Sequence, residues 1–206
     1  MPMIKNSIVI SRTAHYYCLG NDINPSKILI VLHGYAQKAD DFLQTFNKAL
    51  KKDTLIIAPE AISKFYNKKR ETVASWMTSM HREDEIKDYI HYLDTLVENI
   101  NLKFKDIDSI DVLGYSQGCT TASRWVYSTV YQINNLYICS GSCPPELNHK
   151  KNLKALLYFG KEDKILDLKK AHKEIEAYRK IFKVEKLCLF NGGHIISKEC
   201  LEDIIK

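Results

Sequence analysis

Apolar runs and amphipathic segments alternate along almost the whole of this 206-residue chain. The run Lys27–Leu32 is apolar at every position after its first, which is typical of a strand buried on both faces of a sheet. Glu83–Ile100 instead has apolar residues every three or four positions, which predicts a helix with one apolar face. Because the two patterns follow one another in turn, we predict an α/β fold: a mostly parallel central sheet flanked by helices on both faces.

The individual elements follow from the same patterns. The segments predicted to be strands, the first of them as an antiparallel edge strand, are Ser7–Tyr17, Lys27–Leu32, Thr54–Ala58, Ile107–Leu113, Leu136–Cys139, Leu153–Phe159 and Val184–Phe190. The predicted helices are Ala39–Lys51, Glu83–Ile100, Gln117–Val130, Asp167–Ile181 and Ser197–Ile205. No Pro/Gly/Ser-rich stretch divides the chain, so residues 1–206 are predicted to form a single domain.

Two connections differ from the rest. Pro59–Arg82 is predicted to be a long irregular loop. Its part from Ala61 to Arg82 carries most of the net charge of +5, because it has one acid, Glu71, against the basic residues Lys64, Lys68, Lys69, Arg70 and Arg82. Such a run is usually a solvated surface; nucleic-acid binding would need a broader basic face with interleaved aromatics, whereas attraction of anionic substrates is left open. The connection Cys139–Leu153 is short, which leaves no room for a helical lid.

Cysteine usage and the N-terminal residues bear on location and cofactors. The first ten residues hold one lysine and too short an apolar stretch for a signal sequence, and no run of about 18 apolar residues occurs, so we expect a cytoplasmic protein without stable membrane insertion. No C-x-x-C pair or His pair at ligand spacing is present, so no metal or other cofactor is expected. Reduced thiols are expected for Cys18, Cys119, Cys139, Cys143, Cys188 and Cys200.

The segment Gly114-Tyr115-Ser116-Gln117-Gly118 is the strongest chemical signal in the chain. It lies between an apolar run and a helical pattern, which is the context of a nucleophile elbow: a strand, a sharp turn carrying a serine, then a helix. Glycines two residues before and after Ser116 would let strand and helix approach closely. We therefore predict that Ser116 is a nucleophile; the alternative is a serine that merely caps the helix.

A nucleophilic serine needs a base and an acid, and in α/β-hydrolases these follow in the order Ser, Asp or Glu, His. Asp163, in the loop after the strand Leu153–Phe159, is the predicted acid, with Glu162 as the local competitor. His194 follows two glycines after the last predicted strand and is the predicted base. The other histidines fail on position, namely His15, His33, His81, His91, His149 and His172.

The turn His33-Gly34-Tyr35 follows the strand Lys27–Leu32, where this architecture supplies an oxyanion donor. The backbone N–H groups of Tyr35 and Gln117 are therefore predicted to form the oxyanion hole; the alternative for this segment is an ordinary strand-end turn. With Tyr35, the side chains of Trp76, Met77 and Met80 are candidates for lining an acyl groove, against the alternative of plain core packing.

Taken together these motifs resemble the α/β-hydrolase superfamily over nearly the whole chain, and within it the compact, lidless carboxylesterase, phospholipase and acyl-protein thioesterase family. The resemblance rests on His33-Gly34, on the Ser116 motif with Gln117 after the serine, on Gly160-x-x-Asp163 and on Gly193-His194. Ser75-Trp76 followed by Glu83-Asp84 also looks like that family's pattern.

The resemblance implies a serine hydrolase that cleaves small or medium acyl esters or thioesters through an acyl-enzyme intermediate, with a small-molecule substrate and no nucleic-acid partner. Three alternatives are kept: a non-catalytic binding protein on the same scaffold, a lysophospholipase, and a peptidase using the same triad. The sequence leaves open the acyl chain length, the leaving group and the oligomeric state.

Overall fold

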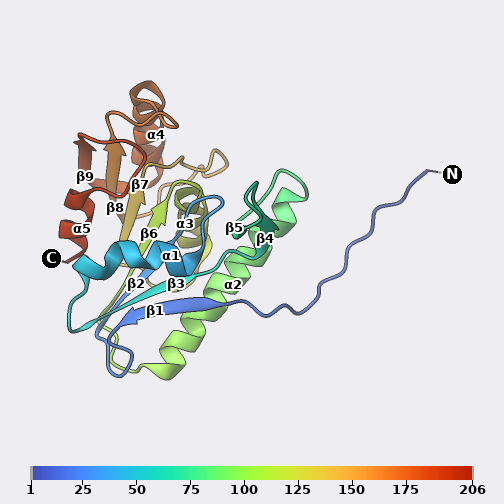
Figure 1. Cartoon of the computed structure of the whole chain (residues 1–206), viewed down its shortest axis with the longest axis horizontal. Helices are drawn as coiled ribbons and strands as arrows, with labels where there is room; N and C mark the ends of the chain where they lie inside the picture. The colour runs from blue at the N-terminus through green and yellow to red at the C-terminus, as the bar shows by residue number, and fades with distance from the viewer. Residues whose placement is uncertain (1, 206) are drawn as a thin grey trace.

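A seven-stranded sheet forms the centre of the protein, whose computed structural model describes residues 2–205. The strands run in the order β1-β3-β2-β6-β7-β8-β9, and only β1 is antiparallel to its neighbour (Figure 1). Their bounds are β1 Tyr16–Gly20, β2 Lys27–Leu32, β3 Thr54–Pro59, β6 Ser109–Tyr115, β7 Asn135–Cys139, β8 Lys154–Gly160 and β9 Lys183–Phe190. This confirms the predicted mostly parallel α/β fold.

Helices cover both faces of the sheet, as predicted. They are α1 Ala39–Leu43, α2 Arg82–Lys103, α3 Gln117–Ser128, α4 Leu168–Ile181 and α5 Lys198–Ile204. In β2, Ile28, Ile30 and Leu32 pack in one core with side chains of α2, α3 and α4. The alternate residues Leu29 and Val31 pack in a second core with side chains of α1 and α5. A strand with a core on each face must be apolar at every position, which explains the unbroken run in β2.

The ends of several elements differ from the predicted ranges. The segment predicted as one helix over Ala39–Lys51 is α-helical only to Leu43 and continues as a 3-10 helix, η1, over Gln44–Ala49. Asp167 and Ser197 are not in their helices but cap them, each accepting a backbone N–H three residues on with its side chain. Both residue types are favoured at this capping position.

The first strand confirms the predicted antiparallel edge but not the predicted range. We predicted Ser7–Tyr17, whereas β1 begins at Tyr16 and pairs with β3 from Tyr16 opposite Pro59 to Gly20 opposite Leu55. Residues 7–15 have the β-branched composition of a strand, but β3 ends at Pro59, and the pairing continues no further than a hydrogen bond from the Glu60 N–H to the His15 carbonyl (2.9 Å). These residues instead belong to an extended segment that leaves the domain beside α2 (Figure 1).

The connection Pro59–Arg82 is not the irregular loop that the sequence predicted. It contains a two-stranded antiparallel hairpin, β4 Ser63–Tyr66 and β5 Thr72–Ser75. In its turn, the Asn67 side chain accepts hydrogen bonds from the N–H groups of Lys69 (2.9 Å) and Glu71 (3.0 Å). Four-residue strands leave too short a pattern to distinguish from a loop. A bridge between Gln37 and Ala74 joins the hairpin to the segment after β2.

The connection between β7 and β8, residues 140–153, contains no helix or strand, so no helical lid is inserted there, as predicted. Among residues 2–205, none of the helices has the length and apolar character needed to cross a bilayer.

Candidate active site

Ser116 occupies the sharp turn between β6 and α3, with φ 53° and ψ −116°, a strained conformation for a residue with a side chain. Its N–H donates to the Cys139 carbonyl at the end of β7 (3.0 Å). A Cβ atom on Gly118 would lie 2.1 Å from the Leu32 carbonyl oxygen, so only glycine fits where α3 passes the end of β2. The predicted strand, sharp turn and helix around Ser116 are therefore present.

Asp163, His194 and Ser116 are joined by hydrogen bonds although they come from three separate loops. The Asp163 Oδ2 atom lies 2.7 Å from His194 Nδ1, and His194 Nε2 lies 2.9 Å from Ser116 Oγ. With the proton on Nδ1, the imidazole donates to the carboxylate and accepts from the serine hydroxyl. Glu162, the competing acid, is exposed. It contacts the neighbouring loop through its backbone N–H, which donates to the Gly192 carbonyl (2.9 Å), rather than through its carboxylate.

Asp163 is held as an ionised acceptor. Burial alone would raise the pKa of its carboxyl group, but hydrogen bonds from the Leu166 N–H, His194 and the Ile165 N–H outweigh burial and hold the pKa below its usual value. The two backbone donors reach Oδ1 at 2.9 and 2.8 Å, which leaves Oδ2 for His194. The loops of Asp163 and His194 also touch: a Cβ on Gly160 would lie 2.2 Å from Gly193 O.

Tyr115 is a site residue that the sequence analysis quoted only as part of the serine motif. Its hydroxyl donates to the backbone carbonyl of His194 (2.7 Å), and its ring centroid lies 5.2 Å from the imidazole. Burial, with the nearby charge of Asp163, raises the pKa of Tyr115 to about 12, so the hydroxyl keeps its proton and remains a donor. The residue before the serine thus holds the loop that carries the histidine.

The two predicted oxyanion donors come from two different segments, the start of α3 and the turn after β2. Gln117 is the first residue of α3, where a backbone N–H has no partner within the helix. In the turn after β2, the N–H groups on either side of Tyr35 are engaged: Gly34 donates to Gln37 Oε1 (2.7 Å) and Ala36 to Ala74 O (2.9 Å). The Tyr35 N–H has no such acceptor among residues 2–205. Its side chain is 60% exposed and stacks on Phe65 of β4.

His33 supports this turn from behind as a neutral, fully buried side chain. Its Nδ1 donates to Gly34 O (2.7 Å), and its Nε2 accepts from the Ala61 N–H (3.1 Å). Burial lowers the pKa of His33, which keeps the ring in this neutral form. Position along the chain had excluded His33 as a base, and the structure gives it a supporting place instead.

The candidate groove residues lie in three different environments. Trp76 is 1% exposed, and its indole N–H donates to His33 O (2.9 Å), so its side chain packs in the core behind the turn. Met77 is half-buried against that core, whereas Met80 is exposed. A hollow of about 680 Å³ adjoins the turn through Ala36 and Gln37, and neither Trp76 nor the two methionines line it. For Trp76 the structure thus favours core packing over a place in an accessible groove.

The Gln117 side chain binds the end of the hairpin to the serine turn. Its Nε2 donates to Ser75 Oγ (3.0 Å) and Met77 O (3.1 Å), and its Oε1 accepts from the Trp76 N–H (3.1 Å). Sequence reasoning used only the backbone of Gln117. The amide after the serine was visible in the motif, but its partners lie about 40 residues away in the chain.

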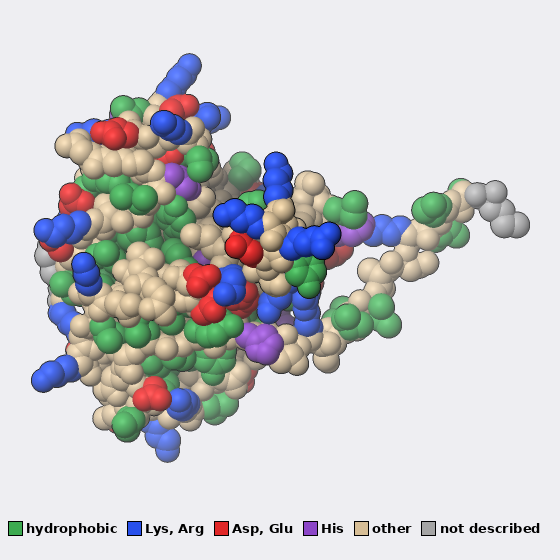
Figure 2. Space-filling view, viewed as in Figure 1, with side chains coloured by type: hydrophobic (Ala, Val, Ile, Leu, Met, Phe, Trp, Pro, Cys, Tyr) green, Lys and Arg blue, Asp and Glu red, His purple; other side chains and the backbone are tan. Residues whose placement is uncertain are grey.

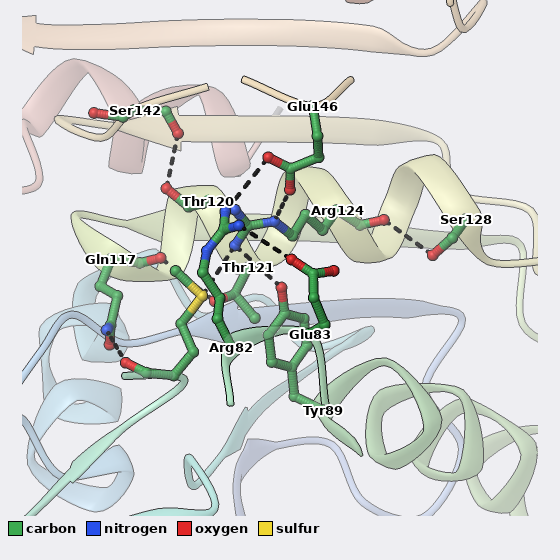
Figure 3. A network of polar contacts seen from close by, with 11 residues as sticks. Arg82, Glu83, Tyr89, Gln117, Thr120, Thr121, Arg124, Ser128, Ser142 and Glu146 are labelled. Atoms are coloured by element: carbon green, nitrogen blue, oxygen red, sulfur yellow. Dashed lines mark hydrogen bonds and ion pairs between the residues drawn. The ribbon is translucent and has the colours of Figure 1, made fainter. Parts of the chain in front are cut away.

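A buried arginine continues this network along α3. Arg124 pairs with Glu146 through a short Nε contact and donates from Nη1 to Met77 Sδ (3.2 Å) and to the Tyr89 hydroxyl (3.3 Å) (Figure 3). Glu146 also pairs with Arg82 at the start of α2 (3.4 Å). Arg124 therefore ties the Met77 segment to α2, α3 and the β7–β8 connection.

No group of three or more His, Cys, Asp or Glu side chains within residues 2–205 is arranged to hold a metal ion.

A mostly parallel sheet with a Ser-His-Asp hydrogen-bonded chain at the carboxyl ends of its strands is the arrangement of an α/β-hydrolase. The sequence matches the phospholipase/carboxylesterase family over residues 20–206. The chain belongs to that family and is a hydrolase of the phospholipase/carboxylesterase type.

Solved structures with the same fold are similar over most of their length. A carboxylesterase from Mesorhizobium loti superposes with a TM-score of 0.75 at 13% sequence identity, covering 93% of this chain and 92% of that one. An acyl-protein thioesterase 2 from Zea mays superposes with a TM-score of 0.69 at 14% identity, covering 94% of this chain and 96% of that one. A Bacillus cereus carboxylesterase superposes with a TM-score of 0.69 at 14% identity, covering 92% of this chain and 91% of that one. A comparison with curated protein sequences finds no significant match.

Proposed function

We propose that this hydrolase cleaves small or medium acyl esters or thioesters with Ser116 as nucleophile, His194 as base and Asp163 as the acid that orients the imidazole. The observation that carries the proposal is the hydrogen-bonded chain from Asp163 through His194 to Ser116, at 2.7 and 2.9 Å. Family membership supports the reaction class. The free state of all six cysteines supports a cytoplasmic location, which we propose with it.

In the first half of the reaction, Ser116 Oγ attacks the acyl carbonyl carbon while His194 Nε2 takes the hydroxyl proton. The negative charge that develops on the carbonyl oxygen is stabilised by the N–H groups of Tyr35 and Gln117. The C–O or C–S bond then breaks, and His194 gives its proton to the departing alcohol or thiol. In the second half, a water molecule loses a proton to His194 and attacks the acyl carbonyl carbon. The bond between that carbon and Ser116 Oγ then breaks, His194 gives the proton to Oγ, and the carboxylic acid is released.

Covalent labelling tests the nucleophile directly. A fluorophosphonate probe should label the full chain at Ser116, and Ser116→Ala should remove the label while the protein stays folded. Ser142→Ala is the matched control, because within residues 2–205 the Ser142 hydroxyl makes no hydrogen bond, and its carbonyl accepts one from the Thr120 hydroxyl (2.9 Å). Labelling that survives in folded Ser116→Ala, or an unlabelled wild-type protein, would contradict the proposed nucleophile and favour the binding-protein alternative.

A substrate panel tests the proposed class. Nitrophenyl esters of increasing acyl length should be hydrolysed alongside acyl-CoA thioesters, and lysophospholipid and peptide amides should be cleaved more slowly if at all. A preference for lysophospholipid or amide over every ester and thioester would replace the proposed substrate class by one of the alternatives on the same triad.

A further inference from the structure

The N-terminal segment, residues 2–15, is called the arm below. It is extended, and it projects from the domain beyond the start of β1 (Figure 1). Its large apolar residues are each 74% to 99% exposed, namely Met3, Ile4, Ile8, Val9 and Ile10. So much apolar surface in one short segment marks an interaction site more often than a solvated tail.

Charge in this region is mostly positive, with Glu60, which is buried, and Glu71 as the acids. From residue 2 to residue 20 the chain has no acidic residue and two cations, Lys5 and Arg12. Residues 61–70 of the hairpin are again free of acids and carry Lys64, Lys68, Lys69 and Arg70, all exposed. Glu71, the acid that follows, accepts a hydrogen bond from the Asn67 side chain (2.9 Å). Both segments therefore present excess positive charge.

The arm and the hairpin form one continuous surface. Residues 12–15 of the arm and Lys64 of β4 line the same small hollow. Further along the arm, Lys5 Nζ lies 2.8 Å from His81 Nδ1, next to the exposed side chain of Met80. Figure 2 shows basic side chains gathered over the hairpin beside the base of the arm, while apolar side chains of the arm stand clear of the domain. Apolar and cationic groups are thus adjacent, not on separate faces.

We propose that the arm and the hairpin together are a docking surface for an anionic lipid bilayer. Apolar side chains that enter the interface, beside cations that meet anionic headgroups, are the combination that gives reversible peripheral binding. Charge complementarity favours this occupant over a second copy of the chain, because two such surfaces would bring their positive charges together. Docking of this kind needs no membrane-spanning helix.

Docking at this surface would also orient the candidate active site. Phe65 of β4 stacks on Tyr35, whose N–H is the proposed oxyanion donor, and β5 leads into the segment held by Gln117. The hairpin is therefore the part of the molecule that connects the docking surface to the site. This step rests on the proposed function and implies that its ester or thioester substrates, other than lysophospholipid, are met at the lipid surface; binding to the bilayer does not depend on it.

Co-sedimentation of the full chain with vesicles tests the docking surface. We expect binding to vesicles of about one third phosphatidylglycerol in phosphatidylcholine, much weaker binding to pure phosphatidylcholine, and loss of binding as salt rises from about 0.1 M to about 0.5 M. Lys68→Glu with Lys69→Glu should weaken binding at least about tenfold. The control Lys169→Glu with Lys173→Glu makes the same charge change on α4 and should leave binding within about twofold.

The contribution of the apolar side chains of the arm is tested separately from that of the charges. Ile8→Ser with Val9→Ser and Ile10→Ser should weaken binding at least about tenfold without destabilising the fold, since these side chains are exposed. The matched control is Ile23→Ser with Leu102→Ser and Val130→Ser, which removes three equally exposed apolar side chains elsewhere.

Three results would overturn the proposal: no binding of the wild type to anionic vesicles, equal effects of the test and control variants, or a wild-type dimer in solution that the arm substitutions dissociate. Hydrolysis of a water-soluble ester is measured in parallel. If vesicle binding is present and hydrolysis absent, the proposed function fails while the docking surface stands; the reverse result leaves the function and removes the surface.

Discussion

The two halves of the candidate site are built in different ways. In the triad half, the side chains of Ser116, His194 and Asp163 contact one another directly, each at the end of its own strand. In the oxyanion half, the proposed donors are the backbone N–H groups of Tyr35 and Gln117, and the side chains of His33 and Gln117 hold the adjoining backbone. Substitutions of the triad side chains should therefore abolish the reaction. Substitutions of the supporting side chains should only displace the backbone donors and slow the reaction.

Ser116→Ala, in the triad half, should have the largest effect on turnover. The hydroxyl is the proposed bond-forming group, so we expect the turnover number to fall by up to ~10⁶ with little change in thermal stability. Ester hydrolysis and thermal unfolding of the same sample measure both quantities. A variant that keeps a tenth of wild-type turnover would remove Ser116 from the mechanism.

Asp163→Asn should have the next largest effect, a fall of about 10²–10⁴ in turnover, because an amide in place of Oδ2 no longer fixes the tautomer of His194. Glu162→Gln is the matched control in the same loop and should change turnover little, since its side chain is exposed. Steady-state kinetics on a soluble ester decide between them. The opposite ranking would assign the acid to Glu162.

Gln117→Leu tests the oxyanion half without touching the backbone donors. Loss of the bonds to Ser75, Trp76 and Met77 should displace the serine turn from the hairpin and lower kcat about tenfold to a hundredfold. Fluorophosphonate labelling should be slower but complete, because Ser116 and His194 remain. Gln132→Leu, an exposed site, is the control. An unchanged kcat would show that the turn keeps its geometry without the amide.

Tyr115→Phe removes a contact that holds the loop of His194, and it should lower kcat less than Gln117→Leu does. Removing the hydroxyl leaves the His194 carbonyl without its donor, which we expect to lower kcat several-fold at nearly constant KM and to cost about 1 kcal/mol of stability. Tyr137→Phe, on the neighbouring strand, is the comparison for loss of a buried hydroxyl. Equal kinetics for both variants would mean that the loop of His194 is held by other contacts.

The smallest effect concerns pH and His33. Burial lowers the pKa of His33 in the folded protein, whereas the unfolded chain takes up this proton near pH ~6.5. As pH falls below that value the unfolded state binds more protons, so stability decreases by up to ~1.4 kcal/mol per pH unit until the folded-state pKa is reached. Urea unfolding from pH 8 to 5 should show a shallower slope for His33→Asn than for the wild type or for His91→Asn. Identical slopes would contradict this assignment.

The sequence by itself determined the α/β class, the presence of the seven strands of the central sheet and the three residues of the hydrogen-bonded triad. Each depends on local patterns: β2 is apolar throughout because it is buried on both sides, and the residues around Ser116 must be small where α3 passes β2. Ser116, Asp163 and His194 meet because parallel strands end at one edge of the sheet, which their places after predicted strands already implied.

Only the tertiary structure decided how the oxyanion turn is supported and where β1 begins. The partners of Gln117, His33 and Tyr115 are about 28 to 79 residues away in the chain, and no local pattern marks contacts over that separation. The apolar residues 8–10 have the pattern of a strand, but a strand needs a neighbour, and β3 ends before reaching them. Hydrogen bonding between distant segments is settled by the fold as a whole, which is why these features appear only in three dimensions.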